Sequence, residues 1–382
     1  MESILKTAFP FIVISAGVLV AFQMVLMIVA YTVLAERKVL GWMQGRVGPN
    51  RVGPWGVLQP FADLLKFIFK EDITPDQSTK FIYFLAPMVA LTCALLPIVV
   101  YPFGPRLSDP MGTIGPWITW AVGWVPVVGT SVVDAVNWIT PQAVNMPLTI
   151  ARIDVGVLFV LGITSVGVYG IMLAGWSSNS KYALMGGLRS SAQMISYELA
   201  MGASVIGVVL LAGTLDLNGI ILAQQQSTFR WYIIPQFIGF IVFLIAAFAE
   251  TNRTPFDLPE AETELVAGFH TEYSALKFAL FFMAEYVNMF TVSMMCTVLF
   301  LGGWYVPGLS HIFEVGSIPY AVVSHFAFIG KICAFLFLYI WVRGTLPRFR
   351  FDQLMNFGWK FLLPVALANV IVTIIVVFFL NR

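Results

Sequence analysis

Charged residues are scarce in this 382-residue sequence. Asp, Glu, Lys and Arg make up 11% of the chain, whereas 59% is hydrophobic and the mean hydropathy is +0.87. Soluble domains carry about a quarter charged residues, so this composition excludes an ordinary soluble globular protein. The formal net charge of +1 gives no indication of a nucleic-acid partner, which usually requires a strongly basic surface.

The sequence also lacks the patterns of common redox and nucleotide sites. Its three cysteines, Cys93, Cys296 and Cys333, lie far apart in apolar segments, which suits neither a disulfide framework nor a zinc or iron–sulfur site. The three histidines are also scattered: they are His270, His311 and His325. There is no Walker A sequence and no GxGxxG after a predicted strand. We therefore expect no metal, haem or flavin on this chain, and electrons would have to come from a partner.

Long uncharged segments recur along the chain. A helix needs about twenty apolar residues to cross the hydrocarbon core of a membrane. Eight segments of this kind are predicted, near residues 9–35, 82–102, 155–175, 190–213, 232–250, 278–302, 317–342 and 361–380. The sequence thus predicts an all-α polytopic membrane protein that forms a single membrane domain over residues 1–382.

The basic residues predict the orientation of these spans. With eight crossings and a cytoplasmic first loop, Lys331 lies within a span and fifteen of the 21 basic residues fall on the cytoplasmic side. The five on the external side are Lys6, Arg106, Arg152, Arg230 and Arg382. One more crossing in the Pro-interrupted stretch after Arg106 would leave ten on each side. The positive-inside rule therefore favours both termini outside, with residues 105–152 as an external or interfacial insertion.

The first cytoplasmic loop, residues 36–80, begins with a charged segment and two Gly-Pro turns. From Val57 to Phe69, apolar residues recur at helical spacing, while Asp63, Lys66 and Lys70 fall elsewhere. This spacing predicts an amphipathic helix lying at the membrane surface. Its lysines could simply face lipid phosphates, so a surface anchor without a further role stays open.

Two carboxylates lie inside predicted spans. Glu198 is in the fourth span, and Glu285 is in the sixth, two turns after Lys277. A buried acid in a span costs several kcal/mol unless it is paired, hydrated or neutral, so both are functional candidates. The alternative is that each makes a single hydrogen bond between helices.

The loop over residues 250–277 is the most acidic part of the chain. Its basic residues are Arg253 and Lys277, and Arg253 is the one base between Glu250 and Glu272. The acids are Glu250, Asp257, Glu260, Glu262, Glu264 and Glu272. Carboxylates so close together raise one another's pKa and share protons. A solvated acidic loop is the simpler alternative, but Phe256, Leu258 and Leu265 lie between the acids and favour a segment that packs against other parts of the protein.

Several motifs in this chain resemble a known family. The longest is Pro255-Phe-Asp-Leu-Pro-Glu-Ala-Glu-Thr-Glu-Leu-Val-Ala-Gly268. The others are Glu36-Arg-Lys38, Gly48-Pro-Asn50, Gln59-Pro-Phe-Ala-Asp63 and Pro347-Arg-Phe-Arg-Phe-Asp-Gln-Leu-Met355. Together they resemble the H-subunit family, the quinone-chamber membrane subunits of proton-translocating NADH:quinone oxidoreductase, which is respiratory complex I. The resemblance covers residues 11–104 and 153–380, whereas the insertion at 105–152 has no counterpart in the compact family pattern.

The resemblance implies both a site and partners. Quinone would be the bound substrate, in a chamber lined by Arg37, Arg46, Asp63, Arg253 and Glu260. A proton path would use Glu36, Glu198, Glu250, Glu260, Glu262, Glu264, Glu272 and Glu285. The partners would be hydrophilic-arm subunits that carry the terminal iron–sulfur cluster, small membrane subunits, antiporter-like subunits and lipids. No metal, haem or flavin would be held by this chain, which would act as an enzyme only within its complex.

Two other functions remain open from the sequence. The chain could be the homologous subunit of a membrane-bound hydrogenase-type complex, which does not necessarily use quinone. It could also be a stand-alone ion-coupled transporter whose substrate site is the acidic loop. A bacterial plasma membrane is the expected location, because the 105–152 insertion departs from the compact organelle-encoded pattern.

Overall fold

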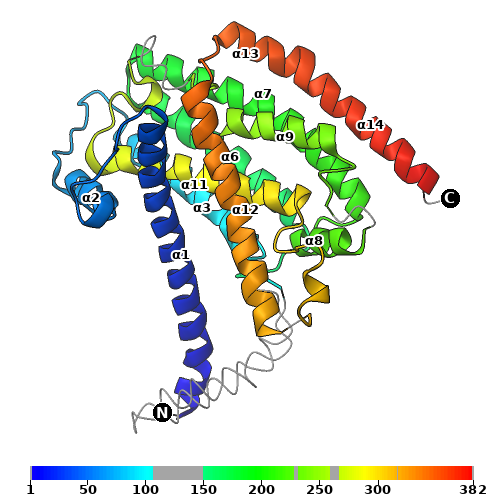
Figure 1. Ribbon diagram of the computed structural model, residues 1–382. Coiled ribbons are helices and arrows are strands. Elements are labelled where there is room, and N and C mark those ends of the chain that lie inside the picture. The colour runs from blue at the N-terminus through cyan, green and yellow to red at the C-terminus, as the bar shows by residue number, and fades with distance from the viewer. Residues whose placement is uncertain (1, 106–148, 228–230, 259–265, 316, 381–382) are drawn as a thin grey trace.

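The computed structural model describes residues 2–105, 149–227, 231–258, 266–315 and 317–380, and all regular structure within these ranges is helical (Figure 1). The longer helices are α1 (Glu2–Met43), α3 (Lys80–Leu95), α6 (Gly156–Ser177), α7 (Lys181–Ala212), α9 (Phe237–Glu250), α11 (Ala275–Phe300), α12 (Ile318–Thr345) and α14 (Leu363–Leu380). The shorter helices are α2 (Gln59–Phe69), α8 (Leu217–Gln226) and α13 (Phe351–Phe357). The predicted all-α class is therefore confirmed for the described residues.

Six helical segments are long and apolar enough to cross a membrane, by length and composition. They are Lys80–Val100, Gly156–Ser177, Lys181–Ala212, Ala275–Phe300, Pro319–Thr345 and Phe351–Phe379. Each contains or closely matches a segment that the sequence predicts as a span. The 42-residue α1 contains the predicted segment 9–35, and the apolar α9 is shorter, at 14 residues. The chain is a multi-pass membrane protein.

The helix α9 begins later than the sequence predicts. The predicted segment starts at residue 232, whereas residues 232–235 form turns and α9 starts at Phe237. Pro235 explains the delay, because the residue before a proline is pushed out of the helical conformation and proline has no N–H to donate. The short helix α8 was not predicted; its first turn is capped by Asp216, whose carboxylate accepts from the N–H of Asn218 at 3.1 Å.

The loops gather at two ends of the bundle. At one end the N–H of Ile73 donates to Ser274 Oγ at 2.8 Å, and the N–H of Phe349 donates to the carbonyl of Pro255 at 3.1 Å. We call this end, which holds residues 36–80, 251–258, 266–274 and 343–350, the charged end. At the other end, the N–H of Ala151 donates to the carbonyl of Val99 at 3.0 Å. Both flanks of residues 106–148, which are outside the described residues, therefore lie at this far end.

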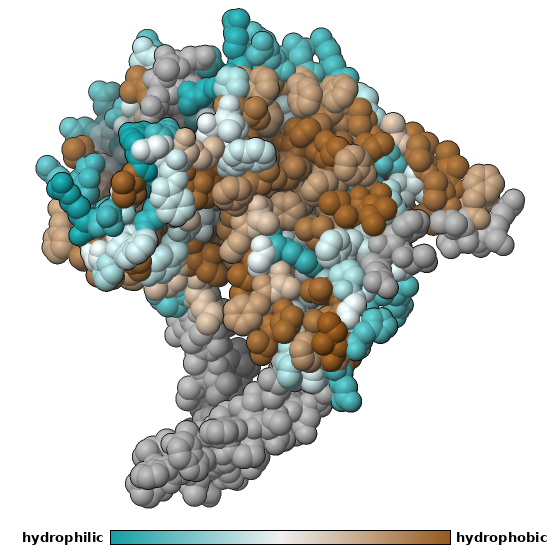
Figure 2. Space-filling model, in the orientation of Figure 1, coloured by the Kyte–Doolittle hydropathy of each residue, from teal (hydrophilic) through white to brown (hydrophobic). Residues whose placement is uncertain are grey.

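The core is centred on α11, with α14 at the periphery. In α11, 61% of the most apolar 18 residues are buried inside the protein, compared with 22% in the last apolar segment, Phe351–Phe379. Phe243, Val298 and Phe300 are fully buried between α9 and α11. Figure 2 shows apolar side chains over the middle of the viewed face and hydrophilic ones above them, around the charged end. This banding fits a bundle whose exposed middle faces lipid.

Candidate functional site

A buried arginine joins three separate parts of the chain at the charged end. Arg253 follows α9, and only 6% of its surface is exposed. Its Nε lies 2.7 Å from Glu285 Oε1 on α11, and its Nη1 lies 3.6 Å from Glu36 Oε1 on α1. The Nε–H does not point at the Glu285 oxygen, so this contact is an ion pair without hydrogen-bond geometry. Three residues predicted from sequence therefore meet in one place.

Two further side chains complete this cluster. Arg343, at the end of α12, donates from Nη1 to Glu36 Oε1. The hydroxyl of Tyr286 donates to Glu36 Oε2 at 2.7 Å, and the guanidinium of Arg253 lies over the Tyr286 ring at 4.1 Å from its centre. Both oxygens of Glu36 are thus engaged. We call Glu36, Arg253, Glu285, Tyr286 and Arg343 the charged cluster.

The charges of this cluster balance, with two carboxylates against two guanidinium groups. Burial alone would lower the pKa of Arg253, but the negative charges of Glu285 and Glu36, together with Tyr286, raise it further, above the ordinary pKa of arginine. Arg253 is therefore a permanent cation. Its Nη2 is buried and has no hydrogen-bond partner among the described residues. An acceptor oxygen from water or from a bound molecule would satisfy this group.

The backbone around Arg253 is held from two sides. The side-chain amide of Gln193, in α7, donates to the carbonyls of Ala249 and Phe256, at 2.7 Å each. On the other side, Arg348 Nη2 donates to Asp257 Oδ2 at 2.9 Å. These contacts fix the loop after α9 between α7 and the segment that follows α12, so the position of Arg253 is set by elements far apart in sequence.

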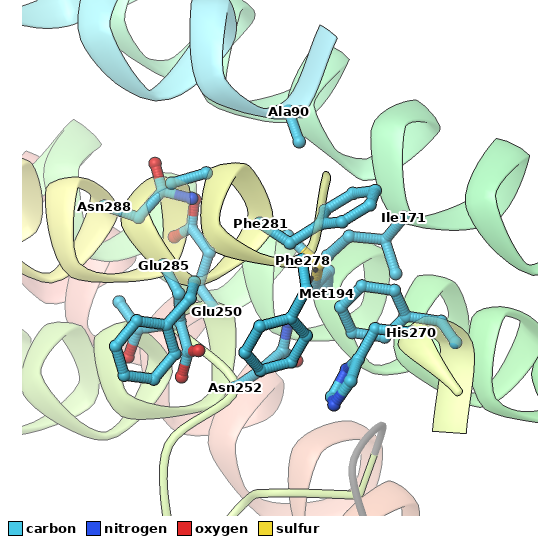
Figure 3. Close-up of a pocket in the computed structure, with 15 residues that line it drawn as sticks. Ala90, Ile171, Met194, Glu250, Asn252, His270, Phe278, Phe281, Glu285 and Asn288 are labelled. Atoms are coloured by element: carbon cyan, nitrogen blue, oxygen red, sulfur yellow. Dashed lines mark hydrogen bonds between the residues drawn. The ribbon is translucent and has the colours of Figure 1, made fainter. Parts of the chain in front are cut away.

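A cavity adjoins the charged cluster. Its volume is about 50 Å³, and it is lined by residues of α3, α6, α7 and α11, by Glu250 at the end of α9 and by the loops that follow α9. A bound water needs about 10–15 Å³, so the space can hold a few. Figure 3 shows Glu250 and Glu285 on one side of this cavity and His270 toward the other. Water molecules in this space would connect the two carboxylates by a route along which protons can pass.

Glu250 is the least compensated acid in the described residues that line this cavity. Its side chain lies at the end of α9, where 8% of the residue is exposed, and its Oε2 is buried without a hydrogen-bond partner. A buried carboxylate oxygen needs either water or a proton. The adjoining cavity can supply the water. A change in the number of water molecules in the cavity would therefore change how readily Glu250 takes up a proton.

Glu198 lies within electrostatic range of Glu250. It is half-buried in α7 and accepts a hydrogen bond from Ser165 Oγ of α6. Its negative charge acts on Glu250 through the bundle. The two intramembrane acids predicted from sequence, Glu198 and Glu285, are therefore both in the neighbourhood of Glu250.

The remaining predicted site residues lie nearer the surface. Arg37 Nη1 forms an ion pair with Asp63 Oδ2 of α2 at 2.7 Å, with side chains 47% and 27% exposed. Arg46 is exposed and donates to Gln44 Oε1. The ion pair places Arg37 beside α2, and no contact between these three residues and the buried charged cluster is seen in the described residues.

The structure places the predicted acids of the 250–277 loop only in part. The backbone carbonyl of Glu272 accepts from the hydroxyl of Tyr83 at 2.6 Å, and its side chain is half-buried. Glu260, Glu262 and Glu264 lie outside the described residues, so their predicted roles stay predictions. Among the described residues, no group of three or more His, Cys, Asp and Glu side chains is arranged to hold a metal ion.

Sequence reasoning missed three members of this site. Arg343 was counted only as a cytoplasmic charge, although it is the first cation after the apolar segment 317–342. Tyr286 directly follows Glu285, and its hydroxyl could have been recognised as a partner for a neighbouring acid. Ser165 gives no signal in the sequence, because many serines lie in apolar helices.

Comparison with known proteins gives a consistent picture. Residues 16–374 match the model of the family described as NADH dehydrogenase. The H subunit 2 of NADH-quinone oxidoreductase from Koribacter versatilis is 54% identical over 360 residues, which cover 93% of this chain and 94% of the relative. The H subunit 1 of the same enzyme from Geobacter sulfurreducens is 49% identical, with 95% and 94% covered.

A third relative has a different subunit name. The NADH-quinone oxidoreductase subunit 8 of Rhodothermus marinus is 47% identical, with 92% of this chain and 94% of the relative covered. Identity of this extent over nearly the full length of each relative leaves little room for a different family. The chain belongs to the H-subunit family of NADH-quinone oxidoreductase, whose members are membrane subunits of respiratory complex I.

Proposed function

We propose that this chain crosses the membrane eight times and forms the membrane wall of a quinone chamber. Alongside the six long apolar helices, α1 and α9 would be the two further spans, because both carry apolar segments predicted to cross. The charged end would face the cytoplasm, and both termini would lie outside. The basic residues of the first loop and of residues 343–350 support this orientation by the positive-inside rule.

The charged cluster would form the inner part of the chamber wall. Arg253 is a fixed cation with an unsatisfied Nη2, which suits an acceptor oxygen on a substrate headgroup. Arg37, Arg46 and Asp63 would lie nearer the chamber entrance, beside α2, and Glu260 would belong to the same chamber. The apolar residues of α2, which are exposed in the chain alone, would meet the isoprenoid tail or the lipid.

Protons would leave the chamber through the carboxylates. Quinone reduction to quinol takes up two electrons and two protons, so charge changes at the headgroup shift the protonation of nearby acids by Coulomb's law. The path would run from Glu36 and Glu285 across the cavity, through water molecules that it would hold, to Glu250 and on to Glu198. Glu260, Glu262, Glu264 and Glu272 of the acidic loop would feed its entrance. The observation that carries this proposal is that one cavity is lined by both Glu250 and Glu285, next to Arg253.

The partners would be the other subunits of the complex. Hydrophilic-arm subunits with the terminal iron–sulfur cluster would dock on the charged end and supply the electrons. Small membrane subunits and antiporter-like subunits would receive the protons, and lipids would cover the apolar middle. The relatives are bacterial and share most of their length with this chain, which supports a bacterial plasma membrane as the location.

The two rival functions receive less support. A subunit of a membrane-bound hydrogenase-type complex would share the helices and the acidic loop, but the relatives are named for quinone reduction. A stand-alone transporter would work as a purified chain in liposomes without quinone. Proteins that co-purify in mild detergent distinguish the three, since each function requires a different set of neighbours.

The test is a Glu250→Gln variant in the assembled complex. Gln keeps the shape of the side chain but cannot exchange a proton, so we expect the number of protons translocated per electron to fall. NADH:quinone activity in the presence of an uncoupler should fall less. Proton translocation is measured in proteoliposomes with a pH-sensitive dye, and the uncoupled activity is measured from the absorbance of NADH.

The control is Glu314→Gln, which changes an exposed acid beyond α11. This variant should leave both rates as they are. Unchanged proton stoichiometry in Glu250→Gln would remove Glu250 from the path.

A further inference from the structure

A lysine in the middle of α12 takes no part in the site described above. Lys331 Nζ donates to three backbone carbonyls, those of Leu301 at 2.7 Å, Gly303 at 2.8 Å and Tyr305 at 2.8 Å. The ammonium also lies 5.0 Å from the centre of the Trp231 ring. We call the three carbonyls and this ring the carbonyl cage.

The geometry of the carbonyl cage favours a protonated lysine. An ammonium group has three N–H donors, which match three acceptors, whereas a neutral amine has two and would turn its lone pair toward the third carbonyl. The aromatic face of Trp231 also favours a cation. The carbonyl of Leu301 lies just past the end of α11, where unpaired carbonyls carry partial negative charge. The three acceptors and the ring thus favour the ammonium form of Lys331 on this helix.

The cage exists because the chain is irregular after α11. Gly302 and Gly303 have positive φ angles of 70° and 54°, so the helix ends there and the next carbonyls have no helical partners. Inside a membrane protein, non-helical backbone needs partners from the surrounding protein. Lys331 supplies these partners from the neighbouring helix.

We propose that Lys331 positions α12 against the end of α11 and thereby brings Arg343 to Glu36. The buried side of α12 is a single apolar stripe that includes Phe328 and Ile332, and Lys331 adds the polar contacts that fix this stripe against the end of α11. Arg343 lies twelve residues beyond Lys331 on the same helix, a distance of about 18 Å at 1.5 Å per residue. A shift or rotation of α12 at the cage therefore moves Arg343. The attachment of α12 by Lys331 does not depend on the proposed function. The effect on activity rests on the proposed function, because it requires Arg343 to be part of the quinone chamber.

The first experiment tests the attachment of α12. Lys331→Met keeps the length of the side chain and removes all three donors and the charge. In the assembled complex, we expect hydrogen–deuterium exchange to rise at residues 301–306 and along α12. Lys181→Met, at an exposed lysine, is the matched control and should change neither region. Exchange that stays the same at both regions in Lys331→Met would overturn the proposal.

The second experiment tests the link to Arg343 with a double-mutant cycle. We expect NADH:quinone activity to fall several-fold in Lys331→Met, because Arg343 is no longer held at Glu36. If Lys331 acts through Arg343, the double variant Lys331→Met with Arg343→Gln should be no less active than Arg343→Gln alone. If the activity losses of the two single variants multiply in the double variant, Lys331 does not act through Arg343. If Arg343→Gln has no effect on activity, the chamber assignment fails, while the exchange experiment still tests the attachment.

Chemical complementation separates the donors from the charge. Lys331→Ala removes the atoms Cγ, Cδ, Cε and Nζ, which n-propylammonium replaces one for one. We expect added n-propylammonium to restore activity in part, and tetramethylammonium, which is charged but has no N–H, to restore none. Equal restoration by both ions would overturn the role of the three hydrogen bonds. If Lys331→Met does not assemble, Lys331→Gln, which keeps two N–H donors, takes its place in the exchange and activity measurements.

Discussion

Two arginine–carboxylate contacts at the charged end have the same length and different surroundings. Arg37 and Asp63 approach to 2.7 Å with side chains 47% and 27% exposed, while Arg253 and Glu285 approach to 2.7 Å with 7% and 17% exposed. Water screens the first pair, so it contributes little to stability. The second pair has lost most of its water, so each member depends on the other. Distance alone therefore does not distinguish a surface contact from a structural one.

The residues of the buried pair also contact more neighbouring side chains than those of the exposed pair. Arg253 meets Glu36 of α1, and Glu36 in turn accepts from Tyr286 and Arg343. Removal of one member leaves an opposite charge buried without compensation, which costs far more than the pair itself is worth. The buried cluster holds four parts of the chain together, whereas the exposed pair attaches only α2 to the end of α1.

The largest effect is expected from Arg253→Met. The change leaves Glu36 and Glu285 without their shared cation, and breaking a buried pair in this way costs about 3–5 kcal/mol. We expect a lower thermal midpoint of the purified complex and a strong loss of NADH:quinone activity. Arg253→Lys, which keeps the charge, should lose less of both. A thermal midpoint equal to that of the wild type in Arg253→Met would contradict the structural role of the cluster.

An intermediate effect is expected from Gln193→Leu. This change removes the amide that joins the carbonyls of Ala249 and Phe256, each of which keeps one backbone N–H partner. The cost is therefore that of two lost hydrogen bonds, about 0.5–1.5 kcal/mol each. The loop around Arg253 should exchange hydrogen faster in the assembled complex. Gln226→Leu, at an exposed glutamine of α8, is the control. Equal exchange at residues 250–258 in both variants would show that Gln193 does not hold the loop.

The smallest effect is expected from Asp63→Asn. The exposed pair with Arg37 contributes about 0–1 kcal/mol, and salt weakens it further. The thermal midpoint of the complex should change little, and the difference from wild type should shrink as ionic strength rises. A loss as large as that of Arg253→Met would mean that the exposed pair is buried in the complex, and the comparison between the two pairs would fail.

Hydropathy alone predicted most of the fold. Each predicted span contains or overlaps a long helix, because uncharged apolar runs of membrane length are typical of membrane-spanning helices. The start of α9 was misplaced, since Pro235 interrupts an apolar segment without changing its hydropathy. The short α8 was missed because its ten residues mix apolar and polar side chains, with no clear period.

The sequence predicted which residues belong to the site, but it did not predict which of them contact one another. Glu36, Arg253 and Glu285 could be named from the sequence because charges are rare in this chain. The contacts between the members of the charged cluster could not be predicted. Two partners of Glu36, Tyr286 and Arg343, lie 250 and 307 positions away from it in the sequence. Such contacts depend on how α1, α11 and α12 are rotated against one another, which one sequence does not specify.

The most direct test of the account is infrared difference spectroscopy of the assembled complex as quinone is reduced. Protonated and ionised carboxyl groups absorb at different frequencies, so a change of protonation gives a paired signal. We predict a carboxyl signal that disappears in Glu250→Gln and persists in Glu314→Gln. An identical difference spectrum in wild type and Glu250→Gln would contradict the claim that Glu250 exchanges a proton during the reaction.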